Sequence, residues 1–262
     1  MVFNMGPILV TRDGAIATVA LNNPGKLNAL HKAMWLRLGE VMRELSADDD
    51  LRCVVLRGSG NKAFAAGADI AEFATERAGS QQARGYGNLI HETMQAVAGC
   101  RHPTVALIQG ACIGGGLEIA AMCDMRICGE ASRFGIPVNR LGLTMAYGEL
   151  QGLLALAGNA VTLEILLEGR VFDAQEAFRK KLVNRVVPDD KVEEEAYACA
   201  SRIAAGAPLV ASWHKQFIDR LTVIAKLTPQ EWDEGFACFD TEDYKEGVDA
   251  FLKKRTPEFK GK

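Results

Sequence analysis

The sequence has neither a Cys-x-x-Cys pair nor a His-x-x-x-His pair, the spacings that usually form a redox-active disulfide or hold a metal ion. Its seven cysteines include no Cys-x-x-Cys pair, and its four histidines lie far apart. The residues concerned are Cys53, Cys100, Cys112, Cys123, Cys128, Cys199 and Cys238, and His31, His91, His102 and His214. An odd number of cysteines in mostly apolar surroundings indicates reduced core residues of a cytosolic protein. We therefore expect no metal site.

The sequence also lacks a large excess of one charge. Its 30 Lys and Arg residues nearly balance 33 Asp and Glu residues, the net charge is −3, and no long basic block occurs. A surface that binds nucleic acid is therefore not expected. The 48% hydrophobic and 24% charged residues are ordinary for a globular protein, which excludes disordered and low-complexity classes. A chain of 262 residues buries roughly 70–75% of its unfolded surface and needs no disulfide or metal for stability.

Targeting and membrane-spanning segments are not evident. No basic segment leads into an apolar run at the N-terminus, and Asp13 interrupts the first apolar stretch, so we expect a cytoplasmic protein without a signal peptide. Residues Thr104–Cys123 are apolar over a length that could span a membrane. Four glycines and Glu118 lie inside this segment, and an acid in the membrane is costly. We interpret it as a buried strand, a glycine turn and a buried helix.

Short β-rich runs alternate with helical patterns along most of the chain. Apolar residues at helical spacing predict helices over His31–Ser46 and Gln82–Gly99. The β-rich runs, each before a turn signal, are Ala15–Leu21, Cys53–Arg57, Thr104–Ile108, Met125–Cys128 and Asn184–Val187. Strands that alternate with helices predict an α/β fold with parallel strands.

The strand signals end at Val187, and helix signals follow. Asp173–Glu176 and Thr228–Glu231 have the sequence of capping boxes, and Pro208 is placed to open a helix. The tail Thr241–Arg255 predicts a last amphipathic helix. We place an α/β core over residues 1–200 and a helical region over 201–262. Small helical appendages of this kind often pack against a neighbouring subunit.

Two glycine-rich segments could bring backbone N–H groups close to a ligand. In Ala65–Ile70 the small residues leave the main chain uncovered, although Asp69 and Glu72 also fit a tight turn with a capping box. Gly114–Glu118 leads into a helix, whose positive end favours a developing anion. Close packing of a turn against the core is the alternative. The spacing of a phosphate or dinucleotide loop is missing, so nucleotide binding is a weak interpretation.

Glu118 stands in the first turn of this apolar helix. Burial would raise the pKa of an unpaired carboxyl there, which suits a general base near neutral pH. The alternative is a structural glutamate satisfied by the helix N-terminus or by Arg126 or Arg140. A basic cluster near the C-terminus is either a solvated face or a partner for phosphate; it contains Lys253, Lys254, Arg255, Lys260 and Lys262. No Gly-x-Ser-x-Gly segment supplies a serine nucleophile.

Seven segments occur in an order that is specific when taken jointly. They are Asn22–Leu30 (NNPGKLNAL), Phe64–Ile70 (FAAGADI), Gln109–Asp124 (QGACIGGGLEIAAMCD), Phe134–Pro137 (FGIP), Glu168–Arg170 with Ala174, Leu182–Val183, and Glu246–Phe251 with Lys254 and Arg255. Over nearly its whole length the chain thereby resembles the crotonase family, the enoyl-CoA hydratase/isomerase superfamily. The resemblance implies a spiral of ββα repeats followed by helices that build a trimer, commonly a dimer of trimers.

The resemblance also implies a ligand and its contacts. The ligand would be an acyl-CoA thioester, with coenzyme A as part of the substrate and no further cofactor. Its carbonyl would lie between the N–H groups of Ala68 and Gly115, which stabilise an enolate, and Glu118 matches one of two catalytic glutamates. The positions that match CoA contacts are Lys26, Leu27, Ala66, Asp69 and Ile70, together with Phe251 and Lys254, which would reach the CoA of an adjacent subunit.

One departure from the family pattern bears on the activity. In hydratases a second glutamate follows the proline of the Phe-Gly-x-Pro segment, and here that position is Val138. Glu149 or Tyr147, on the loop that should line the same pocket, could supply the missing group, or neither side chain points inward. The leading hypothesis is an enoyl-CoA hydratase. An isomerase or a decarboxylase of the same fold, and a non-catalytic acyl-CoA binder, are the alternatives.

Overall fold

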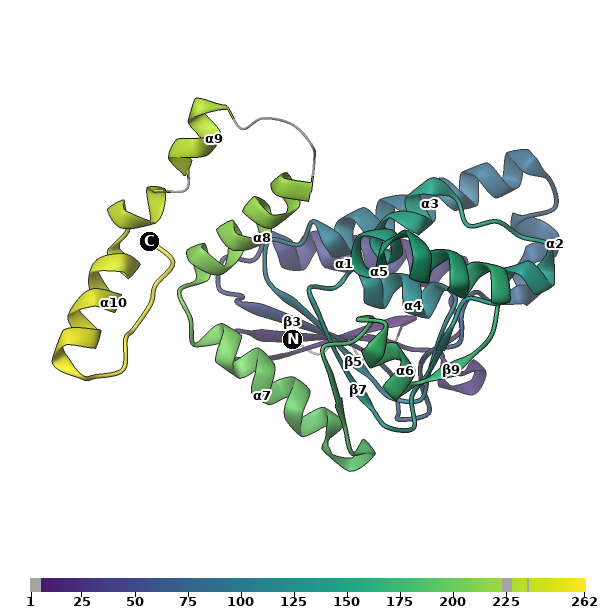
Figure 1. Ribbon diagram of the computed structural model, residues 1–262, viewed down its shortest axis with the longest axis horizontal. Helices are drawn as coiled ribbons and strands as arrows, with labels where there is room; N and C mark the ends of the chain where they lie inside the picture. The colour runs from purple at the N-terminus through teal and green to yellow at the C-terminus, as the bar shows by residue number, and fades with distance from the viewer. Residues whose placement is uncertain (1–5, 223–227, 235) are drawn as a thin grey trace.

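The structure is a computed structural model, which describes residues 6–222, 228–234 and 236–262. Its larger sheet has six strands in the order β1-β2-β3-β5-β7-β10 (Figure 1). Neighbouring strands are parallel except for the hairpin of β1 and β2. These strands are β1 (Ile8–Asp13), β2 (Ile16–Leu21), β3 (Cys53–Gly58), β5 (Thr104–Ile108), β7 (Met125–Gly129) and β10 (Arg185–Val187). Five of them are the predicted β-rich runs, and β1 is an addition.

A smaller sheet of four short strands, in the order β4-β6-β8-β9, was not predicted. Its strands are β4 (Ala63–Ala65), β6 (Ala111–Ile113), β8 (Arg133–Gly135) and β9 (Phe172–Asp173). β4, β6 and β8 run parallel, and β9 pairs with β8 in the antiparallel sense. Each of the first three follows a strand of the larger sheet and precedes a helix. The chain therefore repeats a ββα unit, which agrees with the predicted spiral.

A glycine makes the corner between the two sheets possible. Gly110, between β5 and β6, has a φ of +64°, and a Cβ there would overlap the carbonyl of Lys62. Only glycine adopts this conformation at little cost with a neighbouring backbone so close. The corner turns the chain from the larger sheet into the smaller one.

The main helices follow the strand pairs and pack around the sheets, with α7 on one face of the larger sheet (Figure 1). They are α1 (Lys32–Ser46), α2 (Phe73–Glu76), α3 (Ser80–Ala98), α4 (Gly115–Met122), α5 (Tyr147–Glu168), α6 (Ala174–Arg179) and α7 (Val192–Ala204). On β3, Val54 and Leu56 join the main core, whereas Cys53 and Val55 join a second cluster with α7. Alternate strand residues thus face opposite layers. Two-sided burial explains why these strands are nearly continuous apolar runs.

The predictions for the buried segments hold. Thr104–Cys123 forms β5, β6 and α4, and every residue of α4 is buried, so this segment belongs to the core. All seven cysteines are free, and six of them are buried. Burial raises the pKa of the Cys53 thiol to about 12. The cysteines therefore act as small apolar core residues.

The C-terminal region is helical, as predicted. It contains α8 (Pro208–Thr222), α9 (Pro229–Glu234) and α10 (Glu242–Lys253). In Figure 1, α9 and α10 lie beside the body that holds the sheets, and α8 connects to it. The Lys215 ammonium on α8 donates to the Cys100 carbonyl at 2.6 Å and pairs with Asp124 at 2.7 Å. The predicted boundary near residue 200 lies inside α7, which still packs on the larger sheet.

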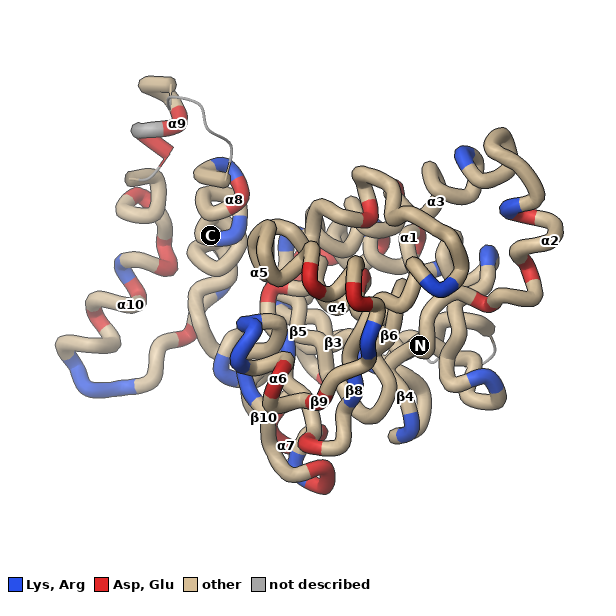
Figure 2. Tube along the Cα trace, turned by 45° about the vertical axis from the view of Figure 1, so that its right-hand side comes forward, with Lys and Arg blue, Asp and Glu red and all other residues tan. Residues whose placement is uncertain are grey.

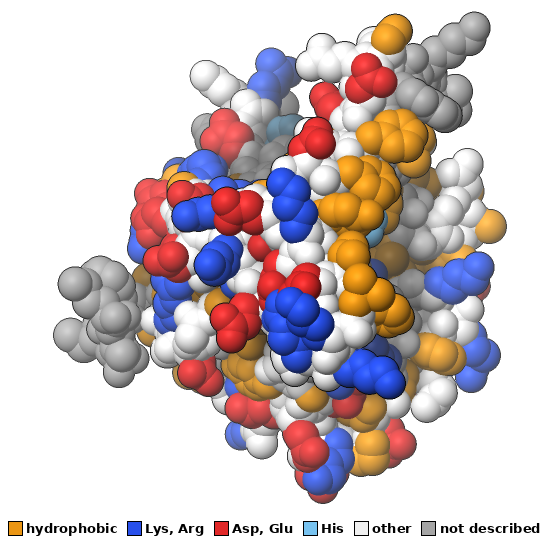
Figure 3. Space-filling model, turned by 90° about the vertical axis from the view of Figure 1, so that its left-hand side faces the viewer, with side chains coloured by type: hydrophobic (Ala, Val, Ile, Leu, Met, Phe, Trp, Pro, Cys, Tyr) orange, Lys and Arg blue, Asp and Glu red, His pale blue; other side chains and the backbone are white. Residues whose placement is uncertain are grey.

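Several helices leave apolar side chains exposed, above all α10 and α5. Along α10 and the turn before it, exposed apolar residues form a stripe, which Figure 3 shows as a row of orange side chains. These residues are Phe236, Phe239, Tyr244, Val248, Phe251 and Leu252. Among the described residues, α5 is the one helix long and apolar enough to cross a membrane, and 17% of its most apolar window is buried.

The assembly into a trimer, which the family resemblance implies, stays a prediction.

Candidate active site

The two glycine-rich segments meet at the carboxyl ends of neighbouring strands. β4 and β6 are parallel neighbours, so the residues that follow them emerge at the same edge of the smaller sheet. Gly67 and Gly114 both have positive φ, and a Cβ on Gly114 would lie 3.5 Å from the Cα of Gly67. Glycine at both positions lets the two backbones approach this closely.

Two backbone N–H groups at this junction have no partner. Leu30 forms an isolated β-bridge with Ala68. The Leu30 N–H donates to the Gly67 carbonyl at 2.7 Å, and the Asp69 N–H donates to the Leu30 carbonyl at 2.8 Å. The bridge therefore leaves the N–H of Ala68 unused. Gly115 opens α4, whose backbone bonds begin with Glu118 N–H donating to the Gly114 carbonyl at 3.0 Å. In the described part of the chain, no hydrogen bond uses the N–H of Ala68 or Gly115. Such a pair can bind a developing oxyanion.

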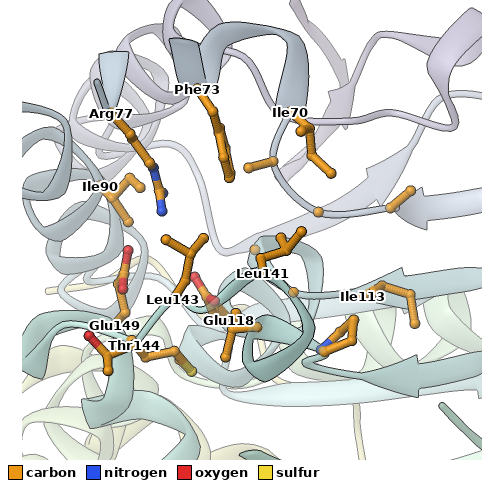
Figure 4. A pocket seen from close by; sticks show the side chains of 18 of the residues that line it. Ile70, Phe73, Arg77, Ile90, Ile113, Glu118, Leu141, Leu143, Thr144 and Glu149 are labelled. Atoms are coloured by element: carbon orange, nitrogen blue, oxygen red, sulfur yellow. The ribbon is translucent and has the colours of Figure 1, made fainter. Parts of the chain in front are cut away.

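A cavity of about 140 Å³ lies directly against these two residues. Figure 4 shows its side chains, most of which are apolar. The apolar walls are formed by Trp35, Ile70, Phe73, Ile90, Ile113, Pro137, Val138, Leu141, Leu143 and Met145. The charged groups are Arg77, Glu118 and Glu149. The cavity therefore combines a short apolar space with acid–base groups and backbone donors.

Glu118 lies in this cavity with its side chain almost fully buried. Its exposed fraction is 7%. Burial raises its pKa to about 8, the negative charge of Glu149 adds to the rise, and the positive charge of Arg77 opposes it. At neutral pH the carboxyl is therefore protonated, so it can donate a proton.

The alternative in which an arginine neutralises Glu118 does not fit the contacts. Arg126 instead donates to the carbonyls of Ala120, Cys123 and Asp124. Within residues 6–222, no ion pair joins Glu118 to Arg126 or Arg140. A buried carboxyl without an ion pair, placed in a cavity, is typical of a functional group.

A second carboxyl enters the same cavity from α5. Glu149 has an exposed fraction of 8%, and one of its carboxylate oxygens, Oε2, accepts the N–H of Ala146 at 2.7 Å. Figure 4 shows its side chain at the same end of the cavity as Thr144, with Glu118 beside it. Val138 lines the cavity as well and brings no carboxyl. The site therefore has two carboxyls, and the second comes from a different element than the family pattern predicts.

Tyr147 does not take part in this cavity. Its exposed fraction is 93%, and it is not among the lining residues. Two residues along an α-helix are separated by about 200° of rotation, so a helix that turns Glu149 inward turns Tyr147 outward. In this structure Glu149 therefore lines the cavity and Tyr147 does not.

The candidate CoA contacts from the first half of the chain lie together at the rim. The Lys26 ammonium pairs with Asp69 at 2.6 Å, and this partner holds the pKa of the Asp69 carboxyl below its usual value. Ala66 N–H donates to the Leu27 carbonyl at 3.0 Å. Ala66 and Ile70 also line the cavity. The two segments thus form one continuous edge.

Phe251 and Lys254 do not join this cavity within the single chain. Phe251 lies on α10 with 83% of its side chain exposed, at the end of the molecule opposite α2 in Figure 1. In the basic cluster, Arg255 pairs with Glu246 and Asp249, and Lys253 pairs with Asp249 (Figure 2 shows the blue end of α10). Contact with the CoA of an adjacent subunit remains a prediction for both residues.

Arg77 is a cavity residue that the sequence analysis missed. It follows the short helix α2 and lies over the rings of Phe73 and Tyr86. Arg77 lies four residues after Phe73, and residues four apart lie on the same face of a helix. Because both closely follow the Ala65–Ile70 segment, this spacing could have indicated that Arg77 lies near the ligand.

Comparison with known proteins identifies relatives of this chain over nearly its whole length. A family model described as enoyl-CoA hydratase/isomerase matches residues 11–262. The chain is 36% identical over 254 residues to the probable enoyl-CoA hydratase echA8 of Mycobacterium tuberculosis, covering 96% of this chain and 97% of that one. It is 33% identical to a short-chain-enoyl-CoA hydratase of Clostridium acetobutylicum, covering 95% of each. A crystal structure of an enoyl-CoA hydratase/carnithine racemase from Magnetospirillum magneticum is 48% identical, with a TM-score of 0.97 over 99% of this chain and 97% of that one.

Proposed function

The chain belongs to the enoyl-CoA hydratase/isomerase family, and from this premise we propose that it adds water reversibly to a trans-2-enoyl-CoA. The observation that carries the proposal is the pair of carboxyls, Glu118 and Glu149, in one cavity beside two unpartnered backbone N–H groups. Hydration needs these parts, because a water molecule must be deprotonated on one side and a carbon protonated on the other.

The backbone donors would stabilise the charge that develops on the substrate. The thioester oxygen would accept hydrogen bonds from the N–H groups of Ala68 and Gly115 as the enolate forms. One such donor is typically worth about 3–4 kcal/mol in the transition state. Gly115 also lies at the positive end of α4, which favours the same charge.

The two carboxyls would divide the proton transfers. Glu149 accepts a proton from water while the hydroxyl adds to C3, and the protonated Glu118 gives its proton to C2. This assignment follows from the pKa of Glu118, which burial raises to about 8. The proton gained by Glu149 must then return to Glu118, directly or through a water molecule. In this account Glu149 replaces the glutamate that the family carries at the position of Val138.

The remaining contacts complete the proposal. Lys26, Leu27, Ala66, Asp69 and Ile70 would hold CoA along the rim of the cavity. Phe251 and Lys254 would reach the CoA of a neighbouring subunit in a trimer or a dimer of trimers. The reaction uses no cofactor besides the CoA of the substrate, and the protein would act in the cytoplasm.

Product analysis tests the proposal. The purified protein is incubated with trans-2-butenoyl-CoA in deuterated water and followed by NMR. We expect 3-hydroxybutanoyl-CoA with deuterium at C2, loss of this product in Glu118→Gln, and normal turnover in Tyr147→Phe, a control two residues from Glu149. A protein that forms no hydroxyacyl product from any trans-2-enoyl-CoA, whether its acyl chain ends in a methyl or in a carboxylate group, would not be a hydratase.

Isomerisation is the second candidate, and the observation that favours it is Val138 at the position of the second family glutamate. One carboxyl is enough to move a proton between two carbons. Deuterium that enters the acyl chain without hydration, and only when Glu118 is present, would assign an isomerase. Binding of the ligand without any exchange would instead indicate an acyl-CoA binder.

A further inference from the structure

Arg77 places a guanidinium group in the wall of the cavity, held between two aromatic rings. Its central carbon lies 4.7 Å from the ring centroid of Phe73 and 4.8 Å from that of Tyr86. Aromatic faces attract a cation and fix the plane of the guanidinium. In Figure 4 the side chain extends from this wall towards the space above Glu118 and Glu149.

This guanidinium has no carboxylate partner in the described part of the chain. Its Nε is buried and makes no hydrogen bond, and no ion pair between described residues involves Arg77. Two other arginines differ from it, because Arg170 pairs with Glu164, Glu168 and Glu176, and Arg255 pairs with two acids. A buried donor without a partner is costly, so its presence calls for an explanation.

The cavity supplies no other cation. Arg77 is the only lysine or arginine among the described residues that line it, and the wall around it is apolar, with Ile70, Phe73 and Ile90. Neither Glu118 nor Glu149 pairs with it. An apolar alkyl chain bound here would leave the N–H groups of Arg77 without acceptors.

We propose that Arg77 binds a carboxylate at the far end of the acyl chain, so that the preferred substrate is the CoA thioester of an unsaturated dicarboxylic acid. A carboxylate fits the edge of a guanidinium with two parallel hydrogen bonds. A site with such an unpaired group selects against a substrate that lacks the partner. The substrate class rests on the proposed function, whereas the binding of the carboxylate does not.

The competing account is that Arg77 only balances the charge of the two glutamates. Its positive charge does lower the pKa of Glu118. In that account its removal would affect every acyl-CoA by the same factor. In ours, removal affects carboxylate-ended substrates selectively.

The test compares two enoyl-CoA substrates that differ only at the chain end. One is 4-carboxybut-2-enoyl-CoA and the other is its neutral amide, 4-carbamoylbut-2-enoyl-CoA, and a second pair has one more methylene. We expect kcat/KM to favour the carboxylate by about 10- to 100-fold in the unaltered protein, the range of a hydrogen-bonded charge. The preference should disappear in Arg77→Gln and be intermediate in Arg77→Lys. Arg84→Gln, an exposed arginine on α3, should keep it.

Equal kcat/KM for acid and amide in the unaltered protein would overturn the proposal, as would an equal loss for both in Arg77→Gln. Calorimetry with the saturated analogues, 4-carboxybutanoyl-CoA and 4-carbamoylbutanoyl-CoA, gives a readout independent of catalysis. If no substrate is hydrated, the proposed function fails. The anion site then stands if the carboxylate analogue binds about 10-fold more tightly than the amide and only with Arg77 present, and it fails if the two bind equally.

Discussion

The larger and the smaller sheet divide stability and chemistry between them. The larger sheet consists of five- and six-residue strands and one of three, and its central strands are buried on both faces. The smaller sheet has strands of two or three residues, yet the segments that follow β4 and β6 supply Ala68, Gly115 and Glu118. A short strand contributes little apolar burial and fixes instead where its carboxyl end lies. The comparison shows that the site depends on backbone placement more than on the main core.

The largest expected effect comes from separating α4 from the smaller sheet. A Cβ at Gly116 would overlap the carbonyl of Ala65 and lie 3.0 Å from its Cβ. Gly116→Val should therefore displace Gly115 and Glu118, and a displacement of about 1 Å can lower kcat about 100-fold. Steady-state kinetics and circular dichroism check this together. A folded variant with unchanged kcat would contradict the role given to the smaller sheet.

A cavity created by mutation in the larger sheet should lower stability and leave kcat nearly unchanged. Leu56 on β3 is fully buried in the main core. Leu56→Ala should lower the free energy of unfolding by about 2–5 kcal/mol, because it removes packed methyl groups and leaves a void. Urea denaturation measures the loss. At a temperature where the variant stays folded, kcat should change little. A large loss of kcat would contradict the claim that the larger sheet contributes to stability and not to the position of the site residues.

Removing the buried acid should stabilise the protein while it stops catalysis. The folded-state pKa of Glu118, about 8, lies above the ordinary glutamate value of 4.5. The folded state therefore holds a proton that the unfolded state releases, and stability falls as pH rises from about 4.5 to 8. Glu118→Gln avoids this loss and should be more stable than the unaltered protein by ~2–4 kcal/mol at pH 8. The difference should shrink towards pH 5, and an equal difference at both pH values would argue against the raised pKa.

The pH dependence of hydration should report the same group. Because Glu118 must be protonated to donate, kcat should fall as pH rises through about 8. The negative charge of Glu149 contributes to the raised pKa of Glu118. In Glu149→Gln the alkaline limb of the residual activity should therefore move to lower pH. An unshifted limb would mean that the two carboxyls do not interact.

The smallest effect is expected at the rim. Lys26 is more than half exposed and pairs with Asp69. Lys26→Gln should raise KM by about 2- to 5-fold, the range of an exposed ion pair, and leave kcat unchanged. Kinetics at two salt concentrations would check this, because salt should reduce the difference.

Sequence patterns predicted the parts of the fold that bury many apolar residues. The runs of the larger sheet, the helices α1 and α3 and the caps at Asp173 and Thr228 all appear in the structure. The strand β1 was missed because its second half is exposed and does not alternate between buried and exposed side chains. The smaller sheet was missed because two or three residues show no periodicity.

Sequence patterns predicted some of the residues that line the cavity and missed others. The apolar helix around Glu118 identified that residue, since a lone acid in an apolar segment stands out. The choice between Glu149 and Tyr147 needed the start of α5, which sequence patterns locate only within several residues. Arg77 was missed because it follows a helix of four residues, too short to show which way its side chains face.

The most direct test of the account is the hydration of trans-2-butenoyl-CoA by Glu149→Gln, beside Tyr147→Phe and the unaltered protein. If Glu149 is the second carboxyl of the site, kcat in Glu149→Gln falls at least about 100-fold, the contribution of a positioned acid or base, and Tyr147→Phe turns over normally. Full hydration by Glu149→Gln would contradict the claim that this cavity works with two carboxyls.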